Sequence, residues 1–192
     1  MTTYFWSDLH FDDHKVAGER GFSSTSAHDN AVIAAWARTV TAADTVWVTG
    51  DLAFDDPTQA LEILRWLPGT KHLVYGNHDT AHPMHANAAS ERIRYEAVFE
   101  TAAPSALISL GGRDTMLSHF PYTSGKLRER HAVHRLQDRG MWLVHGHVHQ
   151  EWRRRGQQIN CGVDMWPDGP VPEATLAAIM TGHELNLARK AA

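Results

Sequence analysis

Five short apolar runs in this sequence each end at side chains that can bind a metal ion. These side chains are aspartate, asparagine and histidine, without cysteine. Carboxylate oxygen, amide oxygen and imidazole nitrogen without thiolate suit Mn, Fe, Zn or Co ions better than a closed structural zinc site. The donor set therefore indicates a reactive metal centre. The segments are Asp8-Leu9-His10, Gly50-Asp51, Gly76-Asn77-His78-Asp79, Ser118-His119 and Gly146-His147-Val148-His149.

The spacing within these segments fits side chains that converge on one pocket. Asp8 and His10 are two residues apart, as are His147 and His149, and alternate residues of an extended chain share a face. A glycine comes directly before the first ligand of three segments, which lets the backbone turn tightly. Each segment alone is a weak signal, because such dipeptides are common in turns. Their ordered occurrence behind five strand-like runs indicates one common site.

Strands alternate with helices in the first half of the chain. Apolar residues at helical spacing predict a helix over 27–40, after a Ser24-Thr25-Ser26 cap, and a second helix that starts at Asp56-Pro57. This alternation favours parallel strands joined by crossover helices. Ligands of such sheets bind beyond the carboxyl ends of the strands, so the segments can meet there. The predicted strands are 4–6, 45–49, 72–75, 115–118 and 141–145.

The second half of the chain has the pattern of hairpins followed by a helix. Two pairs of runs flank glycine-containing turns, and a proline-rich turn at 167–172 precedes the last helix. At 192 residues the whole chain, 1–192, is predicted to be a single α/β domain. We expect two packed, mixed sheets with helices outside. The predicted hairpins pair 105–110 with 114–118 and 150–154 with 157–160, and the predicted helix spans 173–180.

Composition limits the class of partner. A net charge of -4 gives no general attraction to nucleic acid, and no stable nucleic-acid partner is predicted. The run Arg153-Arg154-Arg155 is interpreted as an exposed hairpin tip, with a ligand patch as the alternative. No run approaches the roughly 18 apolar residues of a spanning helix. The single cysteine, Cys161, cannot form an intrachain disulfide, which favours a reducing cytoplasm. Nothing in the sequence marks an oligomer interface.

The motif series from Asp8 to His149 resembles that of the calcineurin-like metallophosphoesterase superfamily, over most of the chain. The resemblance implies a four-layer αββα sandwich, in which two mixed β-sheets are flanked by helices. It also implies two divalent metal ions, with Mn favoured and Fe, Zn, Co or Ni as alternatives. The first ion would be held by Asp8, His10, Asp51 and His149, and the second by Asp51, Asn77, His119 and His147.

The same resemblance assigns catalytic roles to two neighbouring residues. His78 follows Asn77 directly and would donate hydrogen bonds to the phosphate or a proton to the leaving oxygen. Asp79 would orient that imidazole and raise its basicity. Asp51 would bridge the ions, which share a water, lower its pKa and clamp the phosphoryl oxygens for in-line attack.

A finer resemblance is to the small, single-domain branch of this superfamily in bacteria and their phages. Residues 19–23 look like that branch's Arg-Pro-Phe segment, and residues 160–166 look like its segment after the last metal histidine. Arg20 is a candidate phosphate contact, while Tyr122 and Trp166 are candidate surfaces for stacking a base. A structural role in the core is the alternative for all three.

Two positions depart from the pattern of the family. Phe54 stands where many relatives carry a second acid, and His14 lies where the branch has a tighter Phe-Gly-His. We interpret His14 as a surface histidine or one that supports a ligand. The other histidines are interpreted as surface or hydrogen-bonded core residues: His28, His72, His82, His85, His131, His134, His145 and His183. His131 and His134 lie near His119 in sequence, so a substrate role is the alternative for these two.

A complete ligand set can attack monoesters and diesters. Small relatives with a full Asp-x-His pair and a histidine in the Asn-His-Asp motif often hydrolyse phosphodiesters, so by analogy we expect a phosphodiesterase for small substrates such as 2',3'-cyclic nucleotides. A phosphomonoesterase is the alternative. A nuclease is disfavoured because the chain ends soon after the core, and a non-catalytic scaffold is disfavoured because the ligand set is complete.

Overall fold

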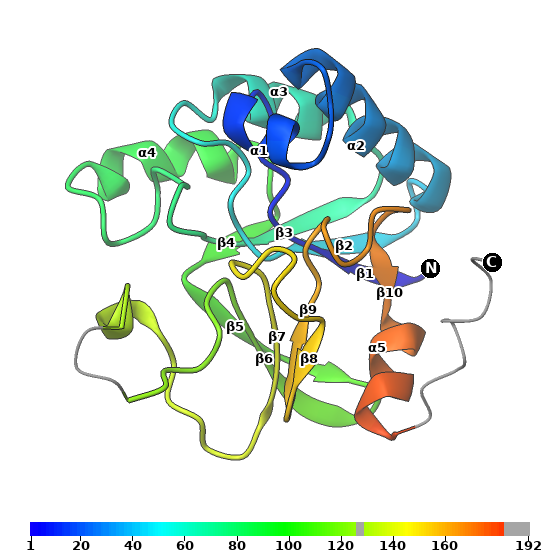
Figure 1. The fold of residues 1–192 in the computed structure, drawn as a ribbon, viewed down its shortest axis with the longest axis vertical. Coiled ribbons are helices and arrows are strands. Elements are labelled where there is room, and N and C mark those ends of the chain that lie inside the picture. The colour runs from blue at the N-terminus through cyan, green and yellow to red at the C-terminus, as the bar shows by residue number, and fades with distance from the viewer. Residues whose placement is uncertain (126–128, 183–192) are drawn as a thin grey trace.

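Two five-stranded sheets form the centre of the molecule, and the computed structural model describes residues 1–125 and 129–182. The elements are β1 (Thr3–Trp6), α1 (His14–Glu19), α2 (Thr25–Thr39), β2 (Thr45–Val48), α3 (Thr58–Trp66), β3 (Thr70–Val74), α4 (Ala88–Glu96), β4 (Thr101–Ala103), β5 (Ser105–Leu110), β6 (Arg113–Ser118), the 3₁₀-helix η1 (Ala132–His134), β7 (Trp142–His145), β8 (Arg154–Arg155), β9 (Gln158–Asn160), β10 (Val171–Pro172) and α5 (Glu173–Met180). The strand order is β10-β1-β2-β3-β4 in the first sheet and β5-β6-β7-β9-β8 in the second. Figure 1 shows α1 to α4 over the first sheet and α5 near β10. The predicted α/β fold of two mixed sheets flanked by helices is confirmed.

The first sheet is built as the sequence predicted. Strands β1 to β4 are parallel neighbours, and β10 pairs antiparallel with β1. The Ser24 hydroxyl accepts a hydrogen bond from the Ala27 amide at 3.1 Å, which caps the start of α2. The Asp56 carboxylate accepts from the Thr58 amide at 3.0 Å at the start of α3. Both crossover helices therefore begin within two residues of their predicted caps.

The second sheet contains one full hairpin and one shortened hairpin. Strands β5 and β6 pair over their whole length as predicted, whereas β8 covers only Arg154–Arg155. The amide group of Asn160 donates to the carbonyls of His149 and Trp152, at 2.8 and 3.1 Å. These bonds hold the stretch before β8 as a loop, so the prediction of a strand over 150–154 is wrong for most of its length.

Several short elements were not expected from the sequence. α1 and η1 are too short for an apolar period to be recognised, and β4 has three residues. α4 is polar, with Ala88 and Tyr95 as its buried residues. β10 lies in the predicted proline-rich turn. Proline lacks an amide donor and is tolerated at a sheet edge, which is where Pro172 lies.

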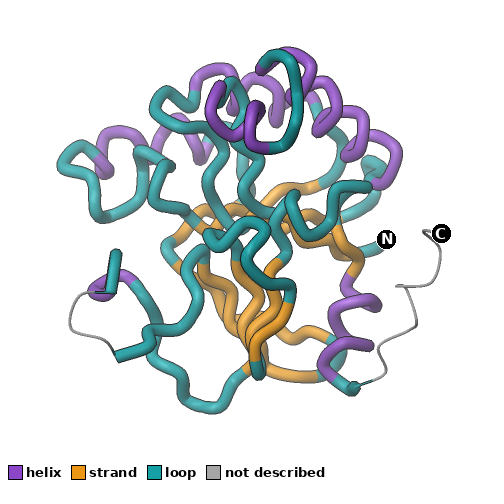
Figure 2. The backbone as a smooth tube through the Cα atoms, in the orientation of Figure 1, coloured by secondary structure: helices purple, strands orange, loops and turns teal. Residues whose placement is uncertain are grey.

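The core is divided between two layers because strand residues alternate in direction. Trp6 of β1 packs with Trp36 of α2 in the cluster between the first sheet and its helices. Phe5, its neighbour, packs with Val144 of β7 in the cluster between the two sheets. Figure 2 shows the strands gathered at the centre, with long loops rising from their ends. Those loops carry the predicted ligands.

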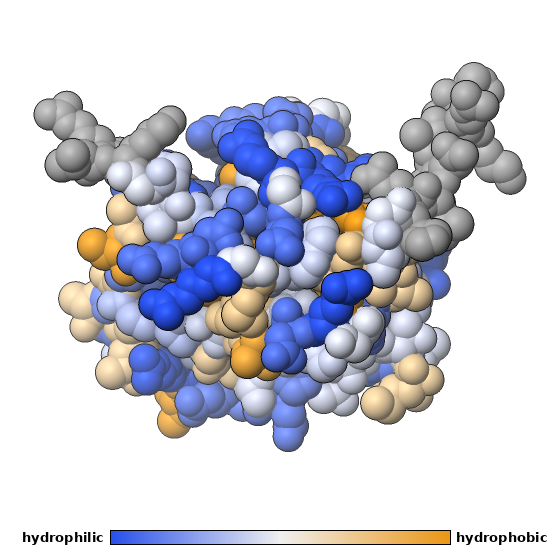
Figure 3. All heavy atoms as spheres, turned by 90° about the horizontal axis from the view of Figure 1, so that it is seen from below, coloured by the Kyte–Doolittle hydropathy of each residue, from blue (hydrophilic) through white to orange (hydrophobic). Residues whose placement is uncertain are grey.

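The surface is mainly polar. Figure 3 shows one face on which hydrophilic residues dominate and apolar residues form small separate groups. In the ranges 1–125 and 129–182, no helix combines the length and apolar character required to span a bilayer.

Candidate metal centre

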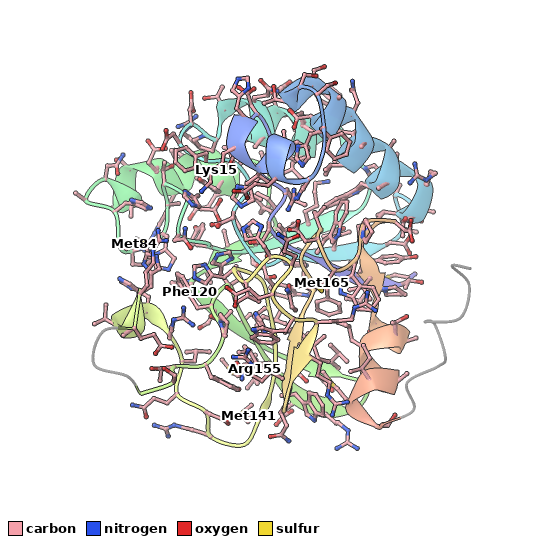
Figure 4. All side chains as sticks on the ribbon, in the orientation of Figure 1. Lys15, Met84, Phe120, Met141, Arg155 and Met165 are labelled. Atoms are coloured by element: carbon pink, nitrogen blue, oxygen red, sulfur yellow. The ribbon has the colours of Figure 1, made fainter. Side chains whose placement is uncertain are left out.

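Two groups of potential metal ligands lie where the strand ends of both sheets meet. Within each group, one ligand atom per residue lies within 4.8 Å of the others. Loops after β1, β2, β6 and β7 supply these residues, which are distant in sequence. Figure 4 shows side chains from both halves of the chain crowding together around the labelled Phe120. The first group is Asp8, His10 and His149, and the second group is Asp51, His119 and His147.

Asp51 lies between the two groups. Its Oδ2 is 3.2 Å from Nε2 of His119 in the second group and 3.8 Å from Nε2 of His10 in the first. The Asn77 amide oxygen is 3.2 Å from the same His119 nitrogen. The structure thus brings all seven predicted ligands together.

The donor atoms fit metal ions. His10 Nε2 is buried without a hydrogen-bond partner among the described residues and lies in reach of the Asp51 carboxylate. A buried, unpartnered imidazole nitrogen costs free energy unless something else occupies it. In the first group, His149 Nε2 lies 3.9 Å from Asp8 Oδ1. Nitrogen and oxygen donors aimed at common points, without thiolate, match hard or borderline divalent ions.

The charges of the second group are strongly coupled. Burial opposes the charge on Asp51, but the His119 and His10 imidazoles hold its pKa well below the usual range. Burial also opposes a charge on His119, but the Asp51 carboxylate raises the pKa of His119 to about 9. Burial and the neighbouring His119 lower the pKa of His147 to about 2. His147 therefore presents a neutral imidazole to the site.

Three of the predicted ligand histidines are oriented by hydrogen bonds from the ring nitrogen that faces away from the site. Nδ1 of His10 donates to the Asp13 carboxylate at 3.0 Å, and Nδ1 of His149 donates to Asp164 at 3.1 Å. In the second group, Nδ1 of His119 donates to the Thr49 carbonyl at 2.8 Å. Such partners fix the ring and leave Nε2 free for an ion.

The backbone at the ligands adopts a conformation that side chains rarely take. Seven described residues other than glycine have positive φ, and five of them are predicted ligands. The left-handed region is unfavourable for residues with a Cβ, and such strain concentrates at functional sites. The five are Asp8 (58°), His10 (49°), Asp51 (56°), His147 (71°) and His149 (44°).

Two glycines let the ligand loops approach one another. A Cβ on Gly76 would overlap the Asp51 carboxylate, and a Cβ on Gly146 would overlap Ser7 and the Asp8 carboxylate. Glycine is therefore required at both positions because the loops touch there. The sequence had indicated glycine only for a tight turn of the backbone.

A family model described as the calcineurin-like phosphoesterase superfamily domain matches residues 1–178. The chain belongs to this superfamily. The family predicted from the motif series is confirmed, and membership supports a hydrolase. The Gene 66 proteins of Mycobacterium phages L5 and D29 are each 35% identical to this calcineurin-like chain, covering 85% and 86% of it and 87% and 89% of their own lengths.

A solved structure of a protein of unknown function from Aquifex aeolicus has the same fold. It is 24% identical, covers 93% of this chain and 98% of its own, and gives a TM-score of 0.68. At this identity the likeness concerns the fold alone.

In this phosphoesterase fold, His78 is fixed by contacts other than the predicted one. Its amide donates to Asp51 Oδ1 at 2.9 Å, and its Nδ1 donates to the carbonyl of Phe54 at 3.0 Å. The half-buried His78 ring has its centroid 5.7 Å from that of His10. Burial lowers the pKa of His78. The Phe54 backbone thus orients the imidazole.

The prediction that Asp79 orients His78 is wrong. Its buried carboxylate accepts hydrogen bonds from the amides of Gly76 at 2.6 Å and of Asp51 and Leu52 at 3.1 Å each. Because these amides belong to two ligand loops, Asp79 ties the loops together instead of contacting the ring. Burial and the charge of Asp51 raise the pKa of Asp79 to about 6.

Asp79→Asn is therefore expected to lower the free energy of unfolding of the metal-free protein by about 3 kcal/mol. Asparagine has one acceptor oxygen, so its NH2 group would face a buried backbone amide that the second carboxylate oxygen now accepts. Urea unfolding in chelator measures this, with Asp55→Asn, at an exposed aspartate, as a control that should be unchanged. Unchanged stability together with a rate loss equal to that of His78→Ala would instead restore the ring-orienting role.

Arg20 is not placed for a phosphate contact. Its side chain is 7% exposed, and its Nε and NH2 both donate to Asp164, at 3.1 and 2.8 Å. NH2 also donates to the Asp8 carbonyl at 2.8 Å. The guanidinium is thus engaged within the protein, and the prediction of a phosphate contact is wrong.

Tyr122 and Trp166 also serve as structural residues. The Tyr122 hydroxyl donates to the Met141 carbonyl at 3.1 Å, and its ring is 7% exposed. Trp166 Nε1 donates to the Asn160 carbonyl at 2.9 Å, and the Arg153 guanidinium covers its ring at 4.5 Å. Both side chains are thus held by contacts within the protein. Tyr122 also lines a pocket beside His147, and base stacking stays a prediction.

The structure agrees with the sequence-based interpretation for His14 and the arginine run, and differs from it for two other histidines. His14 and the run Arg153-Arg154-Arg155 are exposed. Each of these arginines lies over a tryptophan ring. His131 and His145, in contrast, each keep a buried Nε2 that has no partner in the ranges described. His183 lies outside the described residues.

Sequence reasoning missed the residues that orient the ligand imidazoles. Asp13 and Asp164 lie in segments that the sequence did single out, beside His14 and Trp166, but for other residues. A carboxylate near each ligand motif was the available signal. The Thr49 carbonyl carries no signal, because every residue has one.

Proposed function

We propose that this chain is a dinuclear metal-dependent phosphodiesterase that acts on small substrates such as 2',3'-cyclic nucleotides. The observation that carries the proposal is two groups of nitrogen and oxygen donors, with Asp51 Oδ2 3.2 Å from His119 in one group and 3.8 Å from His10 in the other. The first ion would be held by Asp8, His10, Asp51 and His149, and the second by Asp51, Asn77, His119 and His147. Mn is the favoured metal, with Fe, Zn, Co or Ni as alternatives, since imidazole and oxygen donors without thiolate suit this range of ions.

The protein residues prepare the site for in-line attack. Two bound divalent ions would supply a water of lowered pKa and positive charge beside the phosphoryl oxygens. His78 is held by Phe54 through Nδ1, so its Nε2 can donate to the phosphate or protonate the leaving oxygen when the ring is the imidazolium. Burial opposes that charged form, and the negative charge of a bound phosphate would favour it. Asp79 keeps the loops of Asp51 and Gly76 at a fixed separation.

A pocket beside the second ligand group supports a diester substrate. The pocket has a volume of about 410 Å³, and its walls include His147, Tyr122 and Arg155. The Arg155 guanidinium lies 4.7 Å from the centre of the Trp152 ring, so its charge is held at the wall. A diester carries a second organic group or a ring beyond the attacked phosphate, and this space can receive it.

The test compares bis-p-nitrophenyl phosphate with p-nitrophenyl phosphate as substrates of metal-stripped protein to which manganese is returned. We expect no turnover without metal and at least about tenfold faster turnover of the diester, a difference of ~1.4 kcal/mol in barrier. Faster monoester hydrolysis would support the phosphomonoesterase alternative. Bound manganese without turnover of either ester, or of 2',3'-cyclic nucleotides, would contradict the proposed activity.

A further inference from the structure

We propose that Arg20 is a positioning residue that holds the first ligand group, Asp8, His10 and His149, in its binding geometry. The inference rests on the proposed function, because it concerns the metal centre of that site. It gives a role to an arginine whose side chain is bonded within the protein and is not placed to contact a phosphate.

Arg20 contacts two parts of the first group at once. It forms a two-point ion pair with Asp164, whose Oδ2 accepts the hydrogen bond from His149. The same guanidinium donates to the carbonyl of Asp8. A rigid, planar fork can fix two acceptors together, and lysine, with a single ammonium, cannot reproduce this. Arg20 therefore sets the position of the Asp8 backbone and the orientation of the His149 ring.

Arg20 is itself supported from behind. Its NH1 lies 2.8 Å from Nε2 of His28, and Nδ1 of His28 lies 2.9 Å from Asp29. The Asp29 carboxylate in turn accepts from the amide of Asp12, at 3.1 and 3.2 Å, and this residue lies in the loop that carries His10. A continuous polar chain thus starts at His149 and returns to the Asp8–His10 loop. His28 and Asp29 in the middle of this chain are buried.

The second ligand group has a different kind of support. His119 is oriented by a neutral backbone carbonyl, and the Asn77 carbonyl contacts His85 Nε2 at 3.0 Å. Among the described residues, the hydrogen bonds of Arg20 go to the Asp8–His10 loop, to Asp164 beside His149, and to His28. Loss of Arg20 should therefore affect one ion of the pair and spare the other.

The experiment is a manganese titration of the metal-free wild type and of metal-free Arg20→Gln. Equilibrium dialysis and electron paramagnetic resonance measure the bound manganese at each step. We expect about 10–100-fold weaker binding of one ion and unchanged binding of the other, because supporting partners of metal ligands have effects of this size. The signal of a spin-coupled manganese pair should give way to that of an isolated ion.

Two companion variants separate positioning from folding. Asp164→Asn removes the partner carboxylate at nearly constant shape and should give the same selective loss. Arg94→Gln breaks a different arginine bridge, to Asp56 and Glu91, and should leave both affinities unchanged. The free energies of manganese binding should be non-additive when Arg20→Gln is combined with His149→Ala. They should be additive when Arg20→Gln is combined with His119→Ala.

The outcomes distinguish this inference from the proposed function. Equal weakening of both ions in folded Arg20→Gln and Asp164→Asn, or no weakening in either, would overturn the positioning role while wild type still binds two ions. A wild-type chain that binds no manganese would overturn the metal centre and this inference with it. Selective loss of one ion would support Arg20 even if neither ester were hydrolysed.

Discussion

Asp51→Asn is expected to reduce turnover by at least about 10³-fold and to prevent binding of a manganese pair. Loss of a residue that supports a single metal ligand already lowers metal affinity or activity by about 10–100-fold. Asp51 Oδ2 lies 3.2 Å from Nε2 of His119 and 3.8 Å from Nε2 of His10, which belong to different groups. Asparagine can still accept the amide hydrogen of His78 through its oxygen, which preserves the local fold. The loss would therefore come from the missing charge between the groups.

The matched control for this variant is Asp44→Asn. Asp44 is also a buried aspartate, but it accepts from Thr41 and Thr2 at the start of β2, outside the ligand loops. It should retain turnover and metal binding, even if its stability falls. Metal content by mass spectrometry and turnover of bis-p-nitrophenyl phosphate would be measured on the same samples. Two tightly bound ions in Asp51→Asn would show that this carboxylate is not shared.

His78→Ala is expected to retain both ions and to lose rate according to the leaving group. For a 2',3'-cyclic nucleotide the leaving alkoxide is a poor one, so loss of the proton donor should cost about 10²–10⁴-fold in turnover. For p-nitrophenyl esters the leaving phenolate needs no proton, and most of the rate should remain. The comparison thus isolates proton donation from charge stabilisation.

His72→Ala is the control for a lost imidazole. His72 lies on β3, bonded to Thr101 and stacked on Trp47, away from the ligand loops. It should behave as wild type with every ester. Equal losses in His78→Ala for good and poor leaving groups would contradict the acid role and favour contact with the phosphate instead.

The convergence of the predicted ligands could be foreseen because each occupies a position that the backbone defines locally. A strand end followed by Asp-x-His or Gly-His-x-His brings donors to a common edge once the strands are parallel, as β1 to β3 are. The alternation of strands and helices was equally visible, since it depends on short apolar periods. The superfamily and the sandwich fold followed from the same local patterns.

The support of the ligands could not be predicted because it depends on contacts between distant segments. Arg20 and Asp164 are 144 residues apart in sequence, and Asp79 reaches back to Asp51 and Leu52 across 28 and 27 residues. A buried charged residue beside a metal centre looks the same in sequence whether it faces the substrate or the protein. Only the fold decides which partner it meets.

At the predicted ligands with left-handed backbone, a substitution that stabilises the fold would also remove a residue that the proposed activity needs. Glycine at Asp8, His10, Asp51, His147 or His149 would relieve backbone strain of roughly 1 kcal/mol or more at each position while deleting a donor atom. Directed evolution that screens only for heat resistance would therefore tend to erase the reactive centre one ligand at a time. A thermostable version of this enzyme has to obtain its gains elsewhere, and selection in the presence of the metal would be the way to keep these residues.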